Sequence, residues 1–505
     1  MHRRLFILLA ALSSLALAGC DDSVQCGTTF VYDETLMRCA CAAGLTEIDG
    51  TCVPAEGDAG TPPGSDAGTM CVESGIEICD GRDNDCTGGP DDTFACIQGT
   101  ATECTTTCGT TGTATCASDC TIPPTCTPPT ETCNATDDDC DGLVDEGVLA
   151  FGDAVDWTAL GSSAFDLEEY DGGFVVTRIG ATGVEAQLLD ARGQPIGELV
   201  TLVADTAASV LDTTVEEGAL FIAYGTATTS PAGQLRVLSA ELPDLTVRVE
   251  PRTIASPADL PERIQFEKSF YFMIFYQSAG VRVLASSDLA TGTFRDSVVV
   301  GGSVGNFDVV ADDGAFGRAF VAYSQTPAGE SDYEIFVQAV GLSGAEGDAE
   351  RVTDNVHSDD YPRIAHAGGR AAVIWTQQLD DTSLGGTVRL FTGRPTAAAW
   401  IERSDTAVTE IEFLLRSYQI TARAGGWLLV SSDVVDSATV GTLTAHVASA
   451  DGSVVGFGGA MLRYVGWAAG LMTRVRGVGS DVLVPVTVFR DEEGMVEGRV
   501  LSCAR

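Results

Sequence analysis

The sequence predicts an all-β protein, in which a small disulfide-rich N-terminal region precedes a seven-bladed β-propeller. Three observations predict this fold. Fifteen of the 17 cysteines lie between Cys26 and Cys140. In the rest of the chain, short apolar segments recur about every 50 residues. No long segment there has the 3.6-residue period of an amphipathic helix, so the repeated unit is built from strands.

The repeat is clearest in seven short segments rich in β-branched and aromatic residues. They are Phe174-Val-Val-Thr, Phe221-Ile-Ala-Tyr, Met273-Ile-Phe-Tyr, Phe320-Val-Ala-Tyr, Ala372-Val-Ile-Trp, Leu428-Leu-Val-Ser and Leu483-Val-Pro-Val. Their first residues are 47, 52, 47, 52, 56 and 55 positions apart, and each unit has room for four strands. The last unit offers only three candidate strands, so we expect residues 148–157 to supply the fourth and to close the ring.

The first 19 residues predict a lipoprotein signal peptide. A basic start is followed by a short apolar segment, too short for a membrane span, that ends in Leu17-Ala18-Gly19-Cys20. This ending resembles the lipobox of bacterial lipoproteins. The resemblance implies that Cys20 carries lipid and anchors the protein to a membrane of the cell envelope, at the outer membrane or the cell surface. The alternative is an ordinary signal peptide with a chance cysteine.

The charge balance limits the class of partner. The chain has 28 Lys and Arg against 72 Asp and Glu, a formal net charge of -44. Such a surface repels nucleic acid, so we expect no nucleic-acid partner. Solvation alone explains most of these carboxylates, while a local concentration of them favours a cation.

Export implies an oxidising compartment, so the cysteines are expected in disulfides. Residues 20–53 hold Cys26, Cys39, Cys41 and Cys52, and their spacing resembles the C-terminal half of an EGF-like module. Residues 54–70 have the Gly, Pro and Ser content of a flexible linker. Residues 71–147 form a second cysteine-rich region, and residues 148–505 form the predicted propeller.

Residues 71–147 contain a duplication. Residues 77–92 align with residues 131–146 at an offset of 54, and the pairs Cys79/Cys86 and Cys133/Cys140 have the same spacing. Bridges within each pair would close a tight loop, although sequence alone leaves the connectivity open. We call residues 77–92 the first acidic loop and residues 131–146 the second acidic loop.

The second acidic loop has the ligand pattern of a calcium site. Asp137, Asp139 and Asp141 alternate as the first ligands of an EF-hand loop do, and Gly142 stands where that loop turns sharply. The remaining ligands would be the Leu143 carbonyl, Asp145 and Glu146, since the twelfth position is a valine. In the first acidic loop the corresponding candidates are Asp83, Asp85, Asp91 and Asp92. Hard oxygen ligands favour Ca²⁺ over a softer transition metal.

The run Cys79-Asp80-Gly81-Arg82-Asp83-Asn84-Asp85-Cys86 resembles the metal-binding motif of the MopE type, which is repeated in many bacterial surface and secreted proteins. The resemblance implies metal association. The copper binding of the namesake does not carry over, because no histidine or methionine accompanies these loops. The alternative is a solvated acidic loop without an ion.

No catalytic signature stands out in the propeller. His357-Ser358-Asp359 predicts a surface loop rather than an active site, and the aromatic residues Tyr224, Tyr276, Tyr323 and Trp375 predict packing rather than a binding rim. Inward-facing charged residues at repeat-equivalent positions are not evident. We therefore expect a non-enzymatic, membrane-anchored binding or scaffold lipoprotein with a protein or glycan ligand on the propeller. The alternatives are an extracytoplasmic polysaccharide hydrolase or lyase with its site in the propeller channel, and a structural component of an envelope assembly.

Overall fold

The computed structural model describes residues 30–33, 38–41, 45–48, 51–54 and 75–503. Excepted within the last range are residues 135, 143–144, 146, 158–164, 228–232, 258–262, 270, 314–316, 379–385, 396–399, 412–417, 424, 437–439, 454, 466–475, 479–480 and 491–492. The predicted signal peptide, the lipidation site Cys20, the disulfide candidate Cys26 and the predicted ligands Leu143 and Glu146 lie outside the described residues, as does the linker beyond Pro54. The chain divides into two compact units, Met1–Thr93 and Phe94–Arg505.

The first unit contains two short hairpins. Strand β1 (Phe30–Asp33) pairs with β2 (Arg38–Cys41), and β3 (Leu45–Ile48) pairs with β4 (Thr51–Pro54). The disulfide candidates Cys39, Cys41 and Cys52 lie on β2 and β4. The first acidic loop follows these hairpins and contains no strand.

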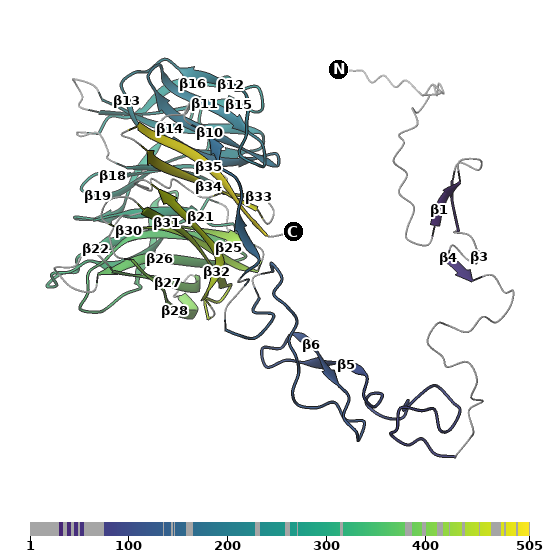
Figure 1. Ribbon diagram of the computed structural model, residues 1–505. Coiled ribbons are helices and arrows are strands. Elements are labelled where there is room, and N and C mark those ends of the chain that lie inside the picture. The colour runs from purple at the N-terminus through teal and green to yellow at the C-terminus, as the bar shows by residue number, and fades with distance from the viewer. Residues whose placement is uncertain are drawn as a thin grey trace, which may run out of the picture. The chain divides into compact units, whose positions relative to one another are not determined.

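The second unit begins with a hairpin of β5 (Ala101–Thr105) and β6 (Thr111–Thr115). It continues into sheets of consecutive antiparallel strands (Figure 1). The first three are β9 (Phe165–Tyr170), β10 (Gly173–Gly180), β11 (Gly183–Leu189) and β12 (Pro195–Val203); β13 (Ala208–Glu216), β14 (Ala219–Ala227), β15 (Gly233–Glu241) and β16 (Thr246–Ala255); and β17 (Ile264–Ser269), β18 (Tyr271–Gln277), β19 (Gly280–Ser286) and β20 (Arg295–Gly301). The next three are β21 (Phe307–Ala311), β22 (Ala319–Gln325), β23 (Glu334–Gly341) and β24 (Gly344–Arg351); β25 (Asp359–Ala367), β26 (Arg370–Gln378), β27 (Gly386–Pro395) and β28 (Trp400–Ile411); and β29 (Tyr418–Arg423), β30 (Gly426–Asp436), β31 (Val440–Ser449) and β32 (Val455–Val465).

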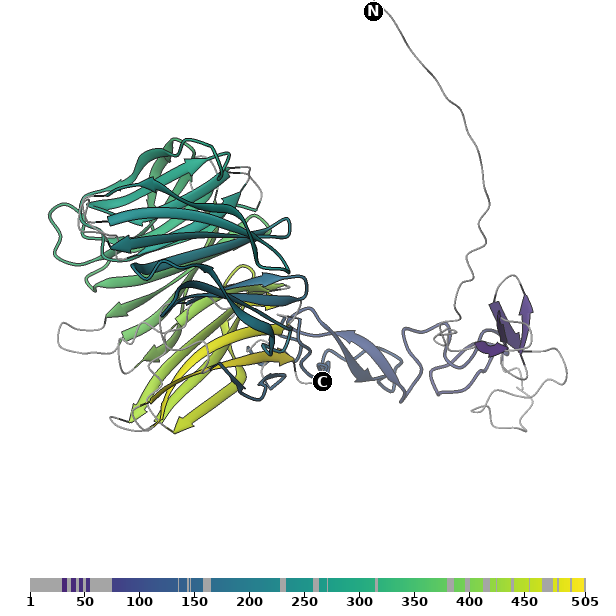
Figure 2. The ribbon, with the colours of Figure 1, turned by 90° about the horizontal axis from the view of Figure 1, so that it is seen from above.

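The seventh sheet joins the two ends of the propeller. It contains β33 (Arg476–Val478), β34 (Asp481–Arg490), β35 (Glu493–Cys503), β7 (Leu149–Phe151) and β8 (Val155–Asp156). Strand β7 pairs with the C-terminal strand, with Leu149 opposite Cys503 and Phe151 opposite Leu501. The prediction that residues 148–157 supply the missing strand is therefore confirmed. Figure 2 shows the yellow C-terminal strands beside the blue first blade.

The seven sheets form a closed ring. The first strand of each blade contacts the first strand of the next, and β33 contacts β9. Each recurring apolar segment lies on the second strand of its blade, for example Ile222 on β14. These second strands are buried on both faces because each blade is covered by its two neighbours, which explains their continuous apolar runs. The predicted seven-bladed propeller is confirmed.

The hydrophobic core consists of layers between adjacent blades. One layer joins Phe275 of the third blade to Val321 of the fourth, and the next joins Phe320 of the fourth to Trp375 of the fifth. Four of the recurring segments end in a large aromatic residue, and all four of these side chains are buried: Tyr224, Tyr276, Tyr323 and Trp375. The packing role predicted for them is thus confirmed.

None of the described residues forms a helix of the length and hydropathy that crossing a membrane requires.

Candidate functional site

The first strands of six blades each carry a polar residue at a similar place, which we call the ring position. Five of these residues lie opposite the residue that precedes the last residue of the recurring segment on the second strand, and the sixth, Asp166, lies opposite Thr177, the last residue itself. The ring positions hold Asp166, Asp212, Gln265, Asp308, Arg363 and Gln419. The sequence reading missed this set, because its members are about 50 residues apart and no local motif marks them.

Three ring-position aspartates bind the backbone of the next blade. Asp166 accepts a hydrogen bond of 2.9 Å from the Thr213 N–H, and Asp212 accepts one of 2.6 Å from the Phe266 N–H. Asp308 accepts one of 2.9 Å from the Ile364 N–H. Each donor follows the ring position of the next blade, so these carboxylates fix the spacing between neighbouring first strands.

A cavity of about 140 Å³ lies among four of the first strands. Its walls are residues of β17, β21, β25 and β29, with Glu267 and Asp308 as the carboxylates and Gln419 and Thr421 as further polar groups. His366 also lines it, with Nδ1 2.9 Å from a carboxylate oxygen of Asp313. Burial lowers the pKa of His366 and favours its neutral form.

Asp308 accepts hydrogen bonds from the first strands on both sides of it. Its Oδ2 accepts from the Ile364 N–H at 2.9 Å. Its Oδ1 accepts from Nε2 of Gln265 at 2.5 Å and lies 3.5 Å from the Arg263 guanidinium. The cavity therefore holds two carboxylates, Asp308 and, on the neighbouring first strand, Glu267.

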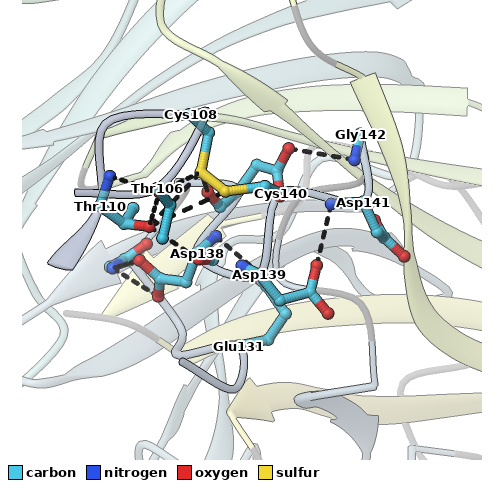
Figure 3. The surroundings of a disulfide bond; sticks show 11 residues. Thr106, Cys108, Thr110, Glu131, Asp138, Asp139, Cys140, Asp141 and Gly142 are labelled. Carbon is cyan, nitrogen blue, oxygen red and sulfur yellow. Dashed lines mark hydrogen bonds between the residues drawn. A yellow bond between two sulfur atoms is a disulfide. The ribbon is translucent and has the colours of Figure 1, made fainter. Parts of the chain in front are cut away.

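The second acidic loop is organised by Glu131, a residue that the predicted ligand set did not include. One oxygen of Glu131 accepts from the N–H groups of Asp138 and Asp139 at 2.7 and 2.8 Å, and the other accepts from the Asp145 N–H at 2.9 Å. Hydrogen bonds to one carboxylate, two residues before Cys133, thus hold three backbone N–H groups of the loop together. Figure 3 shows Glu131 beneath Asp139. Burial raises the pKa of Glu131, against the opposing effect of these hydrogen bonds.

Three carboxylates of this loop point to one place. Oxygen atoms of Glu131, Asp137 and Asp139 lie within 4.8 Å of one another. Oδ1 of Asp137 is buried and has no hydrogen-bond partner in the described part of the chain. A buried carboxylate oxygen without a donor is costly, and a cation supplies the missing partner. This set therefore fits a hard cation, with Glu131 in place of the ligands predicted further along the loop.

The other predicted ligands lie elsewhere. Asp141 is exposed, and its N–H donates to Asp139. Gly142 has a φ of 96°, as the predicted sharp turn requires. Asp145 is fully buried, accepts from the Asn134 N–H at 2.9 Å and pairs with Arg423 at 3.2 Å. Asp145 thus holds the loop in place and does not join the three clustered carboxylates.

The first acidic loop repeats this arrangement. Glu77 accepts from the N–H groups of Asn84, Asp85 and Asp91, and Asp91 accepts from those of Asp80 and Gly81. Equivalent residues of the two loops share a positive φ. The φ is 61° at Cys86 and 65° at Cys140, and it is 51° at Asp91 and 52° at Asp145. The clustered carboxylates here are Glu77, Asp85 and Asp92, while Asp83 is half-buried beside them. Local desolvation, followed by the like charges of Asp85, Glu77 and Asp83, raises the pKa of Asp92.

The disulfides differ from the predicted pairing in the second loop. Cys140 bonds to Cys108, next to the β5–β6 hairpin, so the Cys133–Cys140 pairing is wrong (Figure 3). Two further bridges of the hairpin region are Cys96–Cys116 and Cys104–Cys126. Cys79, Cys86 and Cys133 are also disulfide-bonded. The hydrogen bonds to Glu131 already close the loop, so Cys140 is available to fasten it to the hairpin.

The predicted surface loop before β25 is only partly correct. Asp359 is fully buried, where it accepts from Nε1 of Trp375 at 2.8 Å and from Nδ2 of Asn355 at 2.6 Å. Burial and the neighbouring Glu334 raise its pKa to about 6. Its bonds are to core and loop side chains, and no Ser–His–Asp arrangement involving His357 is formed among the described residues.

Comparison with known proteins finds neighbours by structure only. No protein-family model matches the chain, and no curated protein matches it. Hydrazine synthase from Kuenenia stuttgartiensis is similar to 66% of this chain over 97% of its own, at 10% identity and a TM-score of 0.42. The GH93 α-L-arabinofuranosidase of Fusarium graminearum is similar to 60% of this chain over 94% of its own, at 10% identity and a TM-score of 0.40. The GH43_1 enzyme of Xanthomonas citri is similar to 51% of this chain over 93% of its own, at 13% identity and a TM-score of 0.31. At these identities the likeness concerns the fold.

The comparison goes against one prediction. Glycoside hydrolases recur among the matched structures, which contradicts the expected non-enzymatic binding or scaffold protein. That prediction relied on the lack of a catalytic motif. In a propeller the channel residues come from separate blades, so a site there leaves no local motif in the sequence.

Proposed function

We propose that the second acidic loop binds a calcium ion through Glu131, Asp137 and Asp139. The observation that carries this proposal is the buried Oδ1 of Asp137, which has no hydrogen-bond partner among the described residues and lies beside two further carboxylates. Carboxylate oxygens are the ligands that Ca²⁺ prefers. A bound ion would offset the repulsion among the three negative charges and would stabilise the folded loop.

Calcium titration of the full chain tests this proposal. In an Asp85→Asn background, which weakens the first acidic loop, we expect calcium binding by calorimetry that is lost on adding Asp137→Asn, because this change lowers the charge at the orphaned oxygen while keeping the side-chain shape. Asp141→Asn is the matched control, since Asp141 is exposed and outside the cluster. Equal calcium binding by both variants would contradict the assignment. The first acidic loop, with Glu77, Asp85 and Asp92, is expected to bind a second ion by the same chemistry.

We propose, as a second function, that the propeller hydrolyses a polysaccharide in its channel. The supporting observation is the cavity that Glu267 and Asp308 line from neighbouring first strands. Glycoside hydrolysis generally uses two carboxyl groups, one as general acid and one held ionised as base or nucleophile. We assign the general-acid role to Glu267 and the role of its partner to Asp308, which accepts hydrogen bonds from Gln265 and from the Ile364 N–H.

Screening the purified chain for release of reducing sugar from a panel of polysaccharides tests this second function. Glu267→Gln is expected to lower the rate at least about 100-fold, because the amide cannot supply the proton. Thr421→Val is the control, because it changes another residue of the cavity and leaves both carboxyl groups in place. This variant is expected to retain most of the activity. If the wild type and Glu267→Gln released reducing sugar at the same rate from every polysaccharide, the assignment of Glu267 as the general acid would be refuted.

We propose that the protein reaches the cell envelope as a lipoprotein acylated at Cys20. The support is the Leu17-Ala18-Gly19-Cys20 ending of the apolar segment. Labelled palmitate should enter the wild-type chain and should be absent from Cys20→Ala.

A further inference from the structure

Arg423 is the last residue of β29, the first strand of the sixth blade, and it meets the second acidic loop. Its Nη1 lies 3.2 Å from a carboxylate oxygen of Asp145, and its Nη2 lies 3.2 Å from the Cys133 sulfur. The Arg423 side chain is 5% exposed and the Asp145 side chain 0%. Water hardly screens a pair buried to this degree, so the two side chains fix each other's position.

Asp145 passes this constraint to the candidate calcium ligands. The Asp145 N–H donates to Glu131 at 2.9 Å, and Asp145 in turn accepts from the Asn134 N–H at 2.9 Å. Glu131 is one of the three clustered carboxylates. A displacement of Asp145 would therefore remove a hydrogen bond from one of the proposed ligands.

The same loop leads into the strand that closes the propeller. Only three residues separate Asp145 from β7, which begins at Leu149 and pairs with the C-terminal strand β35. The Cys108–Cys140 bridge holds the other side of the loop to the β5–β6 hairpin. The second acidic loop is thus tied both to the sixth blade and to the closing strand of the seventh.

We propose that Arg423 is a positioning residue for the calcium site and that calcium binding in turn holds the propeller ring closed. The inference rests on the proposed calcium site of the second loop. Arg423 holds Asp145, Asp145 holds Glu131, and Glu131 binds the ion. Because coupling between a binding site and a conformation is reciprocal, an ion that needs this geometry also stabilises the attachment of β7 to β35.

The test measures calcium affinity and ring closure separately in the full chain. An Asp85→Asn background weakens the first loop, so that calorimetry reports the second. Arg423→Met is expected to weaken calcium binding at least tenfold, and Arg423→Lys is expected to recover part of that loss because it restores a positive charge opposite Asp145. A role in packing alone would give the same calcium affinity in all three proteins.

Hydrogen exchange in the chain with wild-type Arg423 provides a second measurement, which stands if Arg423→Met fails to fold. Calcium is expected to slow exchange of the β35 amides near Leu501 and Cys503 at least tenfold relative to chelator, and Asp137→Asn should abolish this effect. Absence of calcium binding in the parent protein would refute the proposed site itself. Normal binding with unchanged affinity in Arg423→Met, or without protection of β35, would overturn the coupling and leave the site standing.

Discussion

Carboxylates hold backbone together in both the second acidic loop and the first strands of the propeller, but they are distributed differently. In the loop, Glu131 accepts hydrogen bonds from three N–H groups of residues at most 14 positions away. In the first strands, Asp166, Asp212 and Asp308 each accept a hydrogen bond from one backbone N–H of the next blade, between 47 and 56 positions away. The loop is a local structure, whereas the contacts between first strands join separate sheets.

This difference changes the meaning of the large negative charge. Solvation explains an exposed carboxylate, yet Asp145, Asp166 and Asp308 are buried and each accepts a hydrogen bond or an ion pair. A charged acceptor of a backbone N–H contributes about 1.5–3 kcal/mol. Part of the acidity is therefore structural, in the loop and in the first strands alike.

The largest effect is expected from removing a buried carboxylate of a first strand. Asp308→Ala leaves the buried Ile364 N–H without its acceptor and also removes the partner of Gln265. We expect a loss of about 4 kcal/mol in the free energy of unfolding, measured by urea denaturation with tryptophan fluorescence. Thr421→Ala, a truncation at the same cavity, should cost about 1 kcal/mol. Equal losses in the two variants would show that the inter-blade hydrogen bond contributes nothing specific.

The pH dependence sharpens the comparison, because Asp359 is buried, accepts hydrogen bonds from the side chains of Trp375 and Asn355, and lies near Glu334. Its pKa rises from 3.8 to about 6, mainly through burial and then through Glu334. A carboxyl group with a raised pKa favours the folded state when protonated. Its contribution is therefore present below pH 4 and is lost as the pH rises through 6.

This difference in pKa corresponds to about 3 kcal/mol. Unfolding free energies measured between pH 4 and 7 should fall by about that amount more in the wild type than in Asp359→Asn, which retains an acceptor for Trp375. Parallel pH profiles for the two proteins would show that Asp359 titrates normally.

The same contrast explains what the sequence could predict. The propeller was predictable because its buried second strands repeat an apolar segment, as at Phe221 and Phe320. The second acidic loop could be recognised as a candidate cation site because its aspartates are close together in the chain. Glu131 was missed as a candidate ligand because the EF-hand pattern starts at Asp137, although Glu77 and Glu131 recur at the same place in both loops.

The ring positions were missed for a different reason. A polar residue that occurs once per blade looks like a surface residue until the pairing of the first strands is known. The partner of Cys140 was missed because its spacing from Cys133 suggested a closed loop, and only the structure brings Cys108 beside it. Contacts between distant segments are set by tertiary packing and leave little trace in local spacing.

The smallest effect tests whether the two acidic loops are interchangeable. In the first loop Nδ2 of Asn84 donates to Asp80, whereas in the second Nδ2 of Asn134 donates to Asp138, so the amide and the carboxylate have changed places. Asn134→Asp alone sets two carboxylates together, and Asp138→Asn alone removes the charged acceptor. Each should cost about 1 kcal/mol.

The double variant Asn134→Asp/Asp138→Asn restores one amide and one carboxylate, in the order of the first loop. Because the two side chains contact each other, we expect a coupling of about 0.5–1 kcal/mol in a double-mutant cycle. Recovery should be incomplete, since Asp138 also accepts from the N–H and hydroxyl groups of Thr132, and the first loop has Ile78 at that position. If the costs of the two single variants add in the double variant, the two side chains are not energetically coupled. The two loops would then share a backbone conformation without sharing this side-chain interaction.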